Sequence, residues 1–356
     1  MALDKKEKAI ELQGITKTFG SVVANDHINL EVRRGEILAL LGENGSGKTT
    51  LMNMISGIYH PDEGTIKING KEVTINSPID AGKLGIGMIH QHFKLVDVFS
   101  AMDNVAMGME GKRVKPKELK EKLTKLTEKY GLEVEPEKKI YNMSVSEKQT
   151  VEILKVLYRN ADILILDEPT AVLTPQETKK LFHILRKMKE QGSAIIIITH
   201  KLNEVMEISD RVTILRKGQS VETVNTSETN EKQLTELMVG RPVTLEIQRP
   251  QCENVFTRLK IVDLSVKAAD GNMAVKDLNL EIKAGEILGV AGVAGSGQKE
   301  LCESIAGLIP VQAGAILHNK ENIVGKTPRE IANLGISLGF VPEDRLGMGL
   351  VRSEEH

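Results

Sequence analysis

Gly42-Glu43-Asn44-Gly45-Ser46-Gly47-Lys48-Thr49 is the stretch that decides the fold of this 356-residue chain. It matches the phosphate-binding pattern G-x-x-x-x-G-K-S/T at every fixed position. An apolar run, residues 37–41, precedes it, and a helix-like segment, residues 50–55, follows it. The pattern needs this order of strand, loop and helix, because the glycines let backbone N–H groups surround an anion at the positive end of a helix. The stretch therefore predicts a loop that binds a nucleoside triphosphate.

The residue types in the loop predict separate contacts with Mg-ATP. Lys48 is expected to reach the β- and γ-phosphates, and the Thr49 hydroxyl is expected to hold Mg²⁺. The alternative is a glycine-rich turn that matches by chance. The predicted nucleotide contacts in this stretch are Gly42, Glu43, Asn44, Gly45, Ser46, Gly47, Lys48, Thr49 and Thr50.

Charge and composition argue against two classes of partner. The formal net charge is only −2, aromatic residues make up 3% of the chain and Trp is absent, so we expect no nucleic-acid partner. The chain has no run of about 18 apolar residues, and its charged N-terminus does not resemble a signal peptide. We therefore expect no membrane-spanning segment.

The chain repeats itself at an offset of 250 residues. Gly-Glu-Ile-Leu at residues 35–38 recurs at 285–288, and Gly-Ser-Gly at residues 45–47 recurs at 295–297. Repetition at this spacing indicates a duplicated domain rather than a short-period array.

We predict three parts: a first domain at residues 9–240, a linker at 241–255, and the N-terminal part of a second, degenerate domain at 256–356. Pro242 and Pro250 mark the linker as breakers of regular structure. Since half a domain cannot bury a full core, we expect the chain to be part of a longer protein.

Two acids follow a second apolar run at residues 163–166. A continuous apolar run is typical of a strand that is buried on both faces of a parallel sheet. Asp167 at its end is a candidate Mg²⁺ ligand, and Glu168 is a candidate for polarising the attacking water. The alternative is a strand with a solvated acidic end.

His200 and Gln91 each follow a further strand-like run, residues 194–199 and 86–90. The carboxyl ends of parallel strands meet at one edge of a sheet, so both side chains are expected near the loop at 42–49. His200 is a candidate for a hydrogen bond to the γ-phosphate, although a lone histidine after a strand is more often structural. The Gln91 amide is a candidate for contact with Mg²⁺ or the attacking water.

Two further features complete the pattern. Phe19 is a candidate for stacking on adenine, and a place in the core is nearly as good an explanation. Between Gln91 and Asp167 the pattern becomes helical, with apolar residues at helical spacing and a glycine that closes the helix. The helical set is Leu119, Leu123, Leu126 and Tyr130, closed by Gly131.

Taken in order, these residues resemble the ATP-binding cassette (ABC) family of transport ATPases over the whole chain. The resemblance implies an α/β P-loop NTPase fold of ABC type, duplicated in tandem, with a RecA-like core, a β-rich edge that carries Phe19, and a helical subdomain at about residues 93–160. It implies ATP and Mg²⁺ as cofactors. It also implies facing pairs of domains, in which the start of a signature helix in one domain contacts the nucleotide of the other.

Within the family, the tandem arrangement looks like the subclass that imports simple sugars and nucleosides. Residues 77–81, 84–96 and 340–345 resemble its nucleoside branch, with a sugar importer as the alternative. This implies transmembrane permease subunits, an indirect substrate-binding (lipo)protein, and a peripheral place at the cytoplasmic face of the plasma membrane. The permease is expected to dock at the apolar residues between Gln91 and Asn104, some of which must instead pack inside the helical subdomain.

The chain departs from the family pattern at two places. Ser146 occupies a position where the family signature has Gly, and Thr150 occupies a position where it has Arg. The alternative interpretation of Ser144-x-x-Glu147 is a capping box that only starts a helix. In the second copy, Gln298 replaces the P-loop Lys, and Lys299 is displaced from its place by about 100° of helix rotation.

In the family's facing pair, both departures fall in one composite site. That site pairs Ser144 and Ser146 with the degenerate second P-loop, and the other site would use the intact P-loop of the first copy, with its signature partner expected beyond residue 356. We therefore predict that the chain binds Mg-ATP at this one intact loop and hydrolyses it poorly. The alternatives are an ABC protein that acts on ribosomes or DNA, which would need long charged helical insertions or arms, and a regulatory nucleotide-binding module with little turnover.

Overall fold

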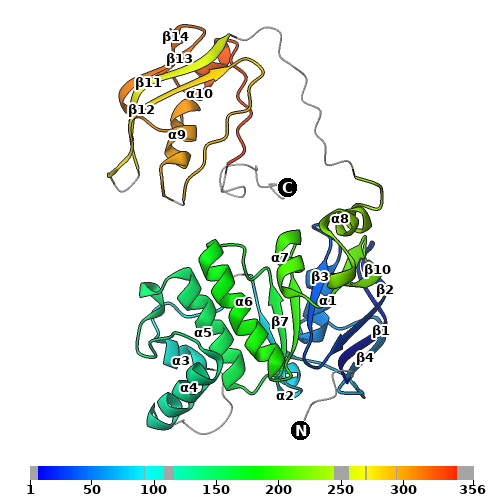
Figure 1. The fold of residues 1–356 in the computed structure, drawn as a ribbon. Helices are drawn as coiled ribbons and strands as arrows, with labels where there is room; N and C mark the ends of the chain where they lie inside the picture. The colour runs from blue at the N-terminus through cyan, green and yellow to red at the C-terminus, as the bar shows by residue number, and fades with distance from the viewer. Residues whose placement is uncertain are drawn as a thin grey trace. The chain divides into compact units, whose positions relative to one another are not determined.

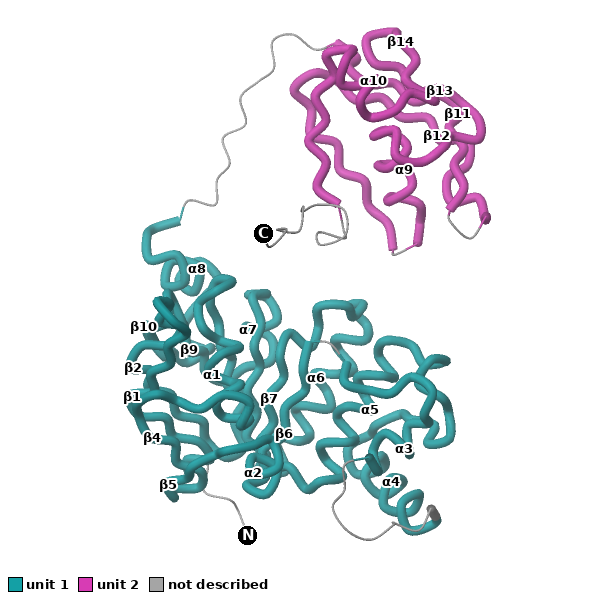
Figure 2. The backbone as a smooth tube through the Cα atoms, turned by 180° about the vertical axis from the view of Figure 1, so that it is seen from behind, with its two compact units in different colours: residues 1–245 teal, residues 246–356 magenta. Residues whose placement is uncertain are grey.

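The structure, a computed structural model, describes residues 7–91, 93–107, 116–243, 256–268, 271–293 and 295–342. The chain divides into two compact units, residues 1–245 and 246–356, which are coloured separately in Figure 2. Most of the predicted linker, residues 244–255, lies outside the described residues. Within the described ranges, no helix combines the length and apolar character that a bilayer crossing requires.

An antiparallel sheet forms one end of unit 1. Its strand order is β2-β1-β4-β5, from β1 (Lys8–Phe19), β2 (Val22–Arg33), β4 (Glu63–Ile68) and β5 (Lys71–Val73). Side chains alternate between the two faces of a strand, so Ile10, Leu12, Ile28 and Leu30 enter the core while their neighbours face outward. This sheet is the predicted β-rich edge that carries Phe19.

A mostly parallel sheet forms the centre of unit 1, in the strand order β10-β9-β3-β8-β7-β6. The five strands from β9 to β6 pair in parallel, and β10 pairs with β9 in antiparallel fashion. The bounds are β3 (Ile37–Leu41), β6 (Ile86–Ile89), β7 (Ile163–Asp167), β8 (Ala194–Ile198), β9 (Arg211–Arg216) and β10 (Gln219–Asn225).

The apolar runs form strands that are covered on both faces, as predicted. In β7, Ile163 and Ile165 pack into a core shared with the antiparallel sheet and α1 (Lys48–Ile55), whereas Leu164 and Leu166 pack into a core shared with α5 (Val145–Tyr158) and α6 (Pro175–Glu190). Every residue of β3, β7 and β8 is buried. A parallel sheet covered on both sides requires this composition.

The helices α3, α4 and α5 gather at the end of unit 1 opposite the antiparallel sheet (Figure 1). The predicted helix through Leu119 and Leu123 is α4, in which both residues are buried, and Gly131 follows it with φ +69°. The remaining unit 1 helices are α2 (Pro78–Lys83), α3 (Ala101–Ala106), α4 (Pro116–Tyr130), η1 (Ile140–Asn142), α7 (Leu202–Ile208), η2 (Thr226–Glu228) and α8 (Glu231–Val239).

Gly87 lets helix α5 approach the edge strand β6 closely. A Cβ atom on Gly87 would lie 2.0 Å from Cγ1 of Val156 in α5 and 3.1 Å from the Cβ of Ala161. Such a separation is far below van der Waals contact, so a larger residue would push the helix away. Helix α5 is therefore seated directly on the strand that leads to Gln91.

Unit 2 is a smaller assembly of one antiparallel sheet, in the order β12-β11-β13-β14, and two helices. Its helices begin 250 residues after α1 and α2, and Thr327 caps the second helix as Ser77 caps α2. The bounds are β11 (Thr257–Lys267), β12 (Met273–Lys283), α9 (Gln298–Ile305), β13 (Val311–His318), β14 (Glu321–Asn322) and α10 (Pro328–Asn333).

Two apolar segments of unit 2 form no strand. Residues 286–293 and 336–342 are irregular, and they leave Ile287 99% and Val341 89% exposed. The residues 250 positions earlier include β3 and β6, which in unit 1 are separated by β8 and β7. Backbone N–H and C=O groups need neighbouring strands as partners, so an apolar sequence alone does not make a strand. This agrees with the expectation that residues 256–356 cannot bury a full core.

Candidate nucleotide-binding site

One edge of the central sheet collects the predicted polar residues. The loop 42–49 joins β3 to α1, and Asp167 ends β7. Gln91, Glu168 and His200 follow the ends of β6, β7 and β8. Because these strands are parallel, their carboxyl ends meet at the same edge, which is the usual ligand-binding edge of such sheets.

The backbone of the loop is shaped by its glycines. Gly47 precedes α1 with φ +94°, and a Cβ there would lie 2.3 Å from the carbonyl oxygen of Ala24. Only glycine tolerates both the left-handed conformation and this approach. The first turn of α1 carries no acidic residue, so the positive end of the helix dipole is available to an anion.

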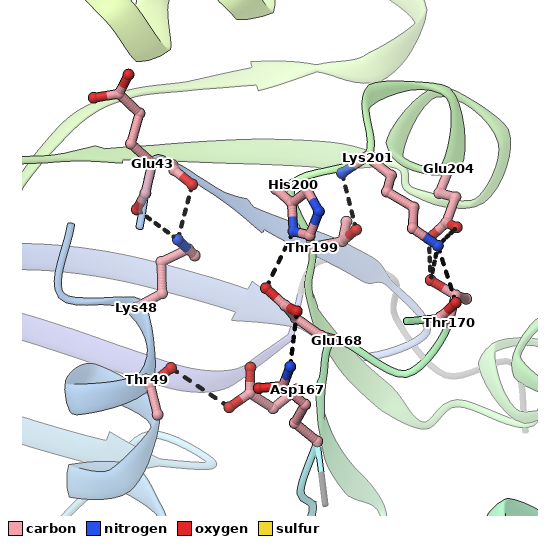
Figure 3. A network of polar contacts seen from close by, with 12 residues as sticks. Glu43, Lys48, Thr49, Asp167, Glu168, Thr170, Thr199, His200, Lys201 and Glu204 are labelled. Atoms are coloured by element: carbon pink, nitrogen blue, oxygen red, sulfur yellow. Dashed lines mark hydrogen bonds and ion pairs between the residues drawn. The ribbon is translucent and has the colours of Figure 1, made fainter. Parts of the chain in front are cut away.

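Lys48 is folded back onto its own loop. Its Nζ donates to the carbonyl oxygens of Gly42 at 2.8 Å and Glu43 at 2.9 Å (Figure 3). The side chain is buried, and this desolvation lowers the pKa of Lys48. Phosphate oxygens are stronger acceptors for an ammonium than peptide carbonyls, so the side chain can exchange these partners for a phosphate.

Thr49 and Asp167 bring two oxygen ligands together. The Thr49 hydroxyl donates to Oδ2 of Asp167 at 3.5 Å, across the gap between α1 and β7 (Figure 3). Burial raises the pKa of the Asp167 carboxyl, and the charge of Glu168 raises it further. A hydroxyl and a carboxylate are hard ligands of the kind that Mg²⁺ prefers, so the donor set suits this ion.

Glu168 lies between the other two predicted catalytic side chains. Nδ1 of His200 lies 3.1 Å from its Oε1, and Nε2 of Gln91 donates to its Oε2 at 3.2 Å. Figure 3 shows Glu168 directed toward His200. Glu168 has φ +46°, an unfavourable conformation for a residue with a side chain. The structure therefore brings together the three side chains that the sequence offers as catalytic candidates.

A buried polar network behind Glu168 was missed by the sequence reasoning. Thr170 donates through Oγ1 to Oε2 of Glu204 at 2.5 Å, and Lys201 Nζ donates to the Thr170 carbonyl at 2.9 Å (Figure 3). Lys201 and Glu204 also form an ion pair at 3.0 Å. The i, i+3 spacing of these two charges at the start of α7 was the available signal. The network ties the residues after His200 to the segment after Glu168.

Phe19 lies at the surface, so its placement in the core, the alternative explanation, is wrong. Its side chain is 43% exposed, and the ring packs edge-on against Tyr59 with centroids 5.2 Å apart. Lys17 places its Nζ 5.5 Å from the ring centroid. An exposed ring that is steadied from one side is available for stacking.

Ser144 and Ser146 stand at the start of α5, in the helical part of unit 1. The capping box is present, because Ser144 accepts from the N–H of Glu147 and Glu147 accepts from the N–H of Ser144. The two departures from the family pattern contact each other, since Thr150 donates through Oγ1 to the Ser146 carbonyl at 2.9 Å. These residues belong to a different element from the loop at 42–49.

The loop of unit 2 carries an amide in place of a cation. A Cβ on Gly292 would lie 2.2 Å from Nε2 of Gln298, so the amide occupies the interior of the loop. Nζ of Lys299 lies 3.9 Å from Glu303 on the outside of α9. Lys299 therefore does not take the place of the missing cation, as predicted.

The apolar segment after Gln91 is divided between core and surface. Leu95 packs against the core of the helical part, whereas Val98 is 65% exposed and Val96 and Phe99 are also exposed. Part of this segment thus packs inside the helical part, as expected, and the rest is exposed. His92 and residues 343–345, which belong to the branch-specific stretches, lie outside the described residues.

Comparison with known proteins agrees with this geometry. The ABC transporter family model matches residues 25–171 and 275–354. The chain is 48% identical to the nucleoside import ATP-binding protein NupA of Lactococcus lactis, over 97% of this chain and 68% of that relative. It is also 48% identical to the guanosine import ATP-binding protein NupO of Bacillus subtilis, with the same two coverages.

A solved structure supports the same assignment. The dimeric post-hydrolysis state of the ATP-binding cassette MJ0796, bound to ADP and Pi, is 25% identical with a TM-score of 0.53, and the match covers 61% of this chain and 98% of that one. The P-loop, the sheet order and these matches lead to one conclusion: the chain belongs to the ABC transporter family and is an ATP-binding ATPase subunit.

Proposed function

We propose that this chain powers the import of nucleosides or simple sugars by binding and hydrolysing ATP beside a membrane permease. The observation that carries the proposal is the complete P-loop facing Asp167 and Glu168 across one sheet edge. Nucleosides are the favoured substrate class, because two relatives at 48% identity are named for nucleoside and guanosine import.

The P-loop residues take the phosphates of ATP. Lys48 exchanges its loop carbonyls for β- and γ-phosphate oxygens, and the N–H groups of residues 42–50 surround the chain of phosphates. Thr49 and Asp167, with Gln91 as a further candidate, would hold Mg²⁺, which neutralises phosphate charge when bound. Phe19 stacks on the adenine ring.

Glu168 orients and polarises the attacking water. Its two carboxylate oxygens are directed by His200 on one side and Gln91 on the other, at 3.1 and 3.2 Å. A carboxylate fixed at both oxygens can accept a proton from water in one defined direction, which is the requirement for a general base. His200 would also donate a hydrogen bond to the γ-phosphate.

We further propose that the second unit is the N-terminal part of a second, degenerate ABC domain, which makes the duplication tandem. The domain parts proposed are residues 9–240, 241–255 and 256–356. In a facing pair, Ser144 and Ser146 would contact the nucleotide held by the opposite domain. That site combines an altered signature with the amide of Gln298, so we expect hydrolysis by this chain to be slow.

The exposed apolar residues after Gln91 are the proposed docking surface for the permease. Val98 and Phe99 are exposed. They lie on the segment that follows Gln91, the residue that donates to Glu168. Because Gln91 lies only a few residues before this segment, a movement of the segment on docking would also move Gln91. The proposal places the protein at the cytoplasmic face of the membrane, with a substrate-binding protein acting indirectly through the permease.

The test is Mg²⁺-dependent binding of a fluorescent ATP analogue to the wild-type chain and to Lys48→Ala. The absence of Trp keeps the protein's own fluorescence low. We expect saturable binding that is lost in the variant, since the phosphate cation is removed. Equal binding by both proteins would show that the loop at 42–49 is not the site, and a regulatory module that binds nucleotide elsewhere would then be the better explanation.

A further inference from the structure

A buried carboxylate on the signature helix holds the segment that follows Gln91. Oε1 of Glu152 accepts from the backbone N–H of Lys94 at 2.6 Å. Oε2 of the same group pairs with Nζ of Lys155 at 3.1 Å, and that Nζ donates to the Lys94 carbonyl at 3.0 Å. Both backbone groups of Lys94 are therefore fixed by two side chains of α5.

The same helix also holds the segment that follows Glu168. Gln149 is buried, and its Nε2 donates to the carbonyl oxygen of Pro169 at 2.7 Å. Pro169 is the residue immediately after Glu168. Gln149 and Glu152 are three residues apart in α5, so they lie on one face of the helix.

The two segments held by α5 carry side chains that contact each other. Gln91 donates to Glu168 at 3.2 Å, and each residue is only a few positions from a backbone group bonded to α5. A helix is stiff along its axis, so its side chains keep the two segments at a fixed separation. A movement of α5 would change the Gln91–Glu168 contact from both sides.

We propose that Glu152 and Gln149, on the signature helix, are positioning residues that set the geometry of the Gln91–Glu168 contact. This inference rests on the proposed function of Gln91 and Glu168. The start of α5 carries Ser144 and Ser146, so contact at that end is transmitted to the attacking-water site of the same unit. We call Gln149, Glu152 and Lys155 the α5 clamp. It links the start of α5 to the contact between Gln91 and Glu168.

The chemistry of the clamp favours positioning over simple packing. A carboxylate with only 5% of its side chain exposed is costly to bury, and an apolar residue would pack at the same place without that cost. Glu152 accepts from the N–H of Lys94, and its ion-pair partner Lys155 donates to the carbonyl of the same residue, so both charges hold one loop residue. Polar groups in such a position specify one loop conformation.

The first measurement is amide hydrogen exchange of the nucleotide-free chain. Glu152→Ala removes the acceptor of the Lys94 N–H, so exchange in a peptide covering residues 93–99 should rise, while a peptide covering β7 should not change. The matched control is Val151→Ala, a fully buried residue of the same helix, which loses stability but keeps both side-chain hydrogen bonds to Lys94. Unchanged exchange in residues 93–99 of Glu152→Ala would overturn the proposal.

The second measurement is the rate of ATP hydrolysis in a single turnover, with binding affinity measured in parallel. We expect Glu152→Ala to lower the rate by about ten- to a hundredfold with little change in affinity, because a misplacement near 1 Å has this effect. Glu152→Gln keeps an acceptor for the Lys94 N–H and should retain most of the rate. Val151→Ala should retain the rate as well.

A double-mutant cycle separates positioning from general damage. If Glu152 acts through Gln91, adding Glu152→Ala to Gln91→Ala should cause no further loss of rate. Additive losses, or an unchanged rate in Glu152→Ala alone, would overturn the proposal. Failure of the wild-type chain to bind ATP would instead refute the proposed function, and the exchange experiment would still decide whether the clamp holds the loop.

Discussion

The two glycines at the centre of the P-loop should respond very differently to the same substitution. Gly45 and Gly47 both have left-handed backbones, with φ +79° and +94°. A Cβ on Gly45 would meet no atom within 4 Å, whereas one on Gly47 would lie 2.3 Å from the Ala24 carbonyl oxygen. Gly45→Ala therefore isolates the conformational cost, and Gly47→Ala adds a collision with β2.

The size of each effect follows from that geometry. A left-handed alanine costs about 1–2 kcal/mol, which is the whole expected loss of stability for Gly45→Ala. Carbon and oxygen in contact lie about 3.4 Å apart, so the loop of Gly47→Ala must move by about 1 Å. A displacement of that size at a reacting or binding group can cost about a hundredfold. We expect about hundredfold weaker Mg-ATP binding for Gly47→Ala and less than about tenfold for Gly45→Ala.

The assay is a titration with a fluorescent ATP analogue, accompanied by thermal unfolding of each variant. Unfolding shows whether a variant is folded at the temperature of the titration. Equal loss of affinity in the two variants would mean that the approach of the loop to β2 does not matter. Normal binding by Gly47→Ala would refute the reasoning outright, because the loop would then tolerate a displacement that the contact with Ala24 demands.

Two further substitutions test the chemistry of the site. Burial and the charge of Glu168 raise the pKa of Asp167, so ionisation of this carboxyl lowers the stability of the fold as the pH rises above about 3.8. Without nucleotide, Asp167→Asn should therefore have a higher melting temperature than wild type at pH 7.5, and the difference should shrink toward pH 4. In the same variant, Mg²⁺ should no longer strengthen ATP binding. Phe19→Ala should weaken ATP binding by roughly five- to a hundredfold, as loss of one stacked base predicts, while Phe19→Tyr should retain the affinity for ATP. Because Phe19 is exposed, neither substitution should change the melting temperature of the protein.

The strands and the loop could be predicted because their signals are local. Residues 37–41, 163–166 and 194–198 are apolar at every position, and only a sheet that is covered on both faces accommodates such runs. Parallel pairing then places the residues after these strands at one edge. The grouping of Glu168, Gln91 and His200 follows from that topology.

The contacts made by α5 could not be predicted, because they depend on packing between elements far apart in the chain. Glu152 reads as one more charged residue on a helix, and nothing in its neighbours indicates a bond to the backbone of Lys94, 58 residues earlier. Gln149 belongs to the signature stretch, but its partner, Pro169, is an acceptor through its backbone alone. A backbone partner carries no side-chain signature, so only the structure reveals it.

The loops of the two units separate what the glycines do from what the lysine does. Gly295 and Gly297 have φ +82° and +91°, close to the +79° and +94° of Gly45 and Gly47, so the backbone turns in the same way in both loops. Lys48 and Gln298 each begin the helix that follows, yet only Lys48 brings a charge into the loop. The turn is therefore formed without the cation. The shape of the loop therefore does not distinguish the two units, whereas the charge of Lys48 does, and a charged partner is what strengthens a hydrogen bond to phosphate.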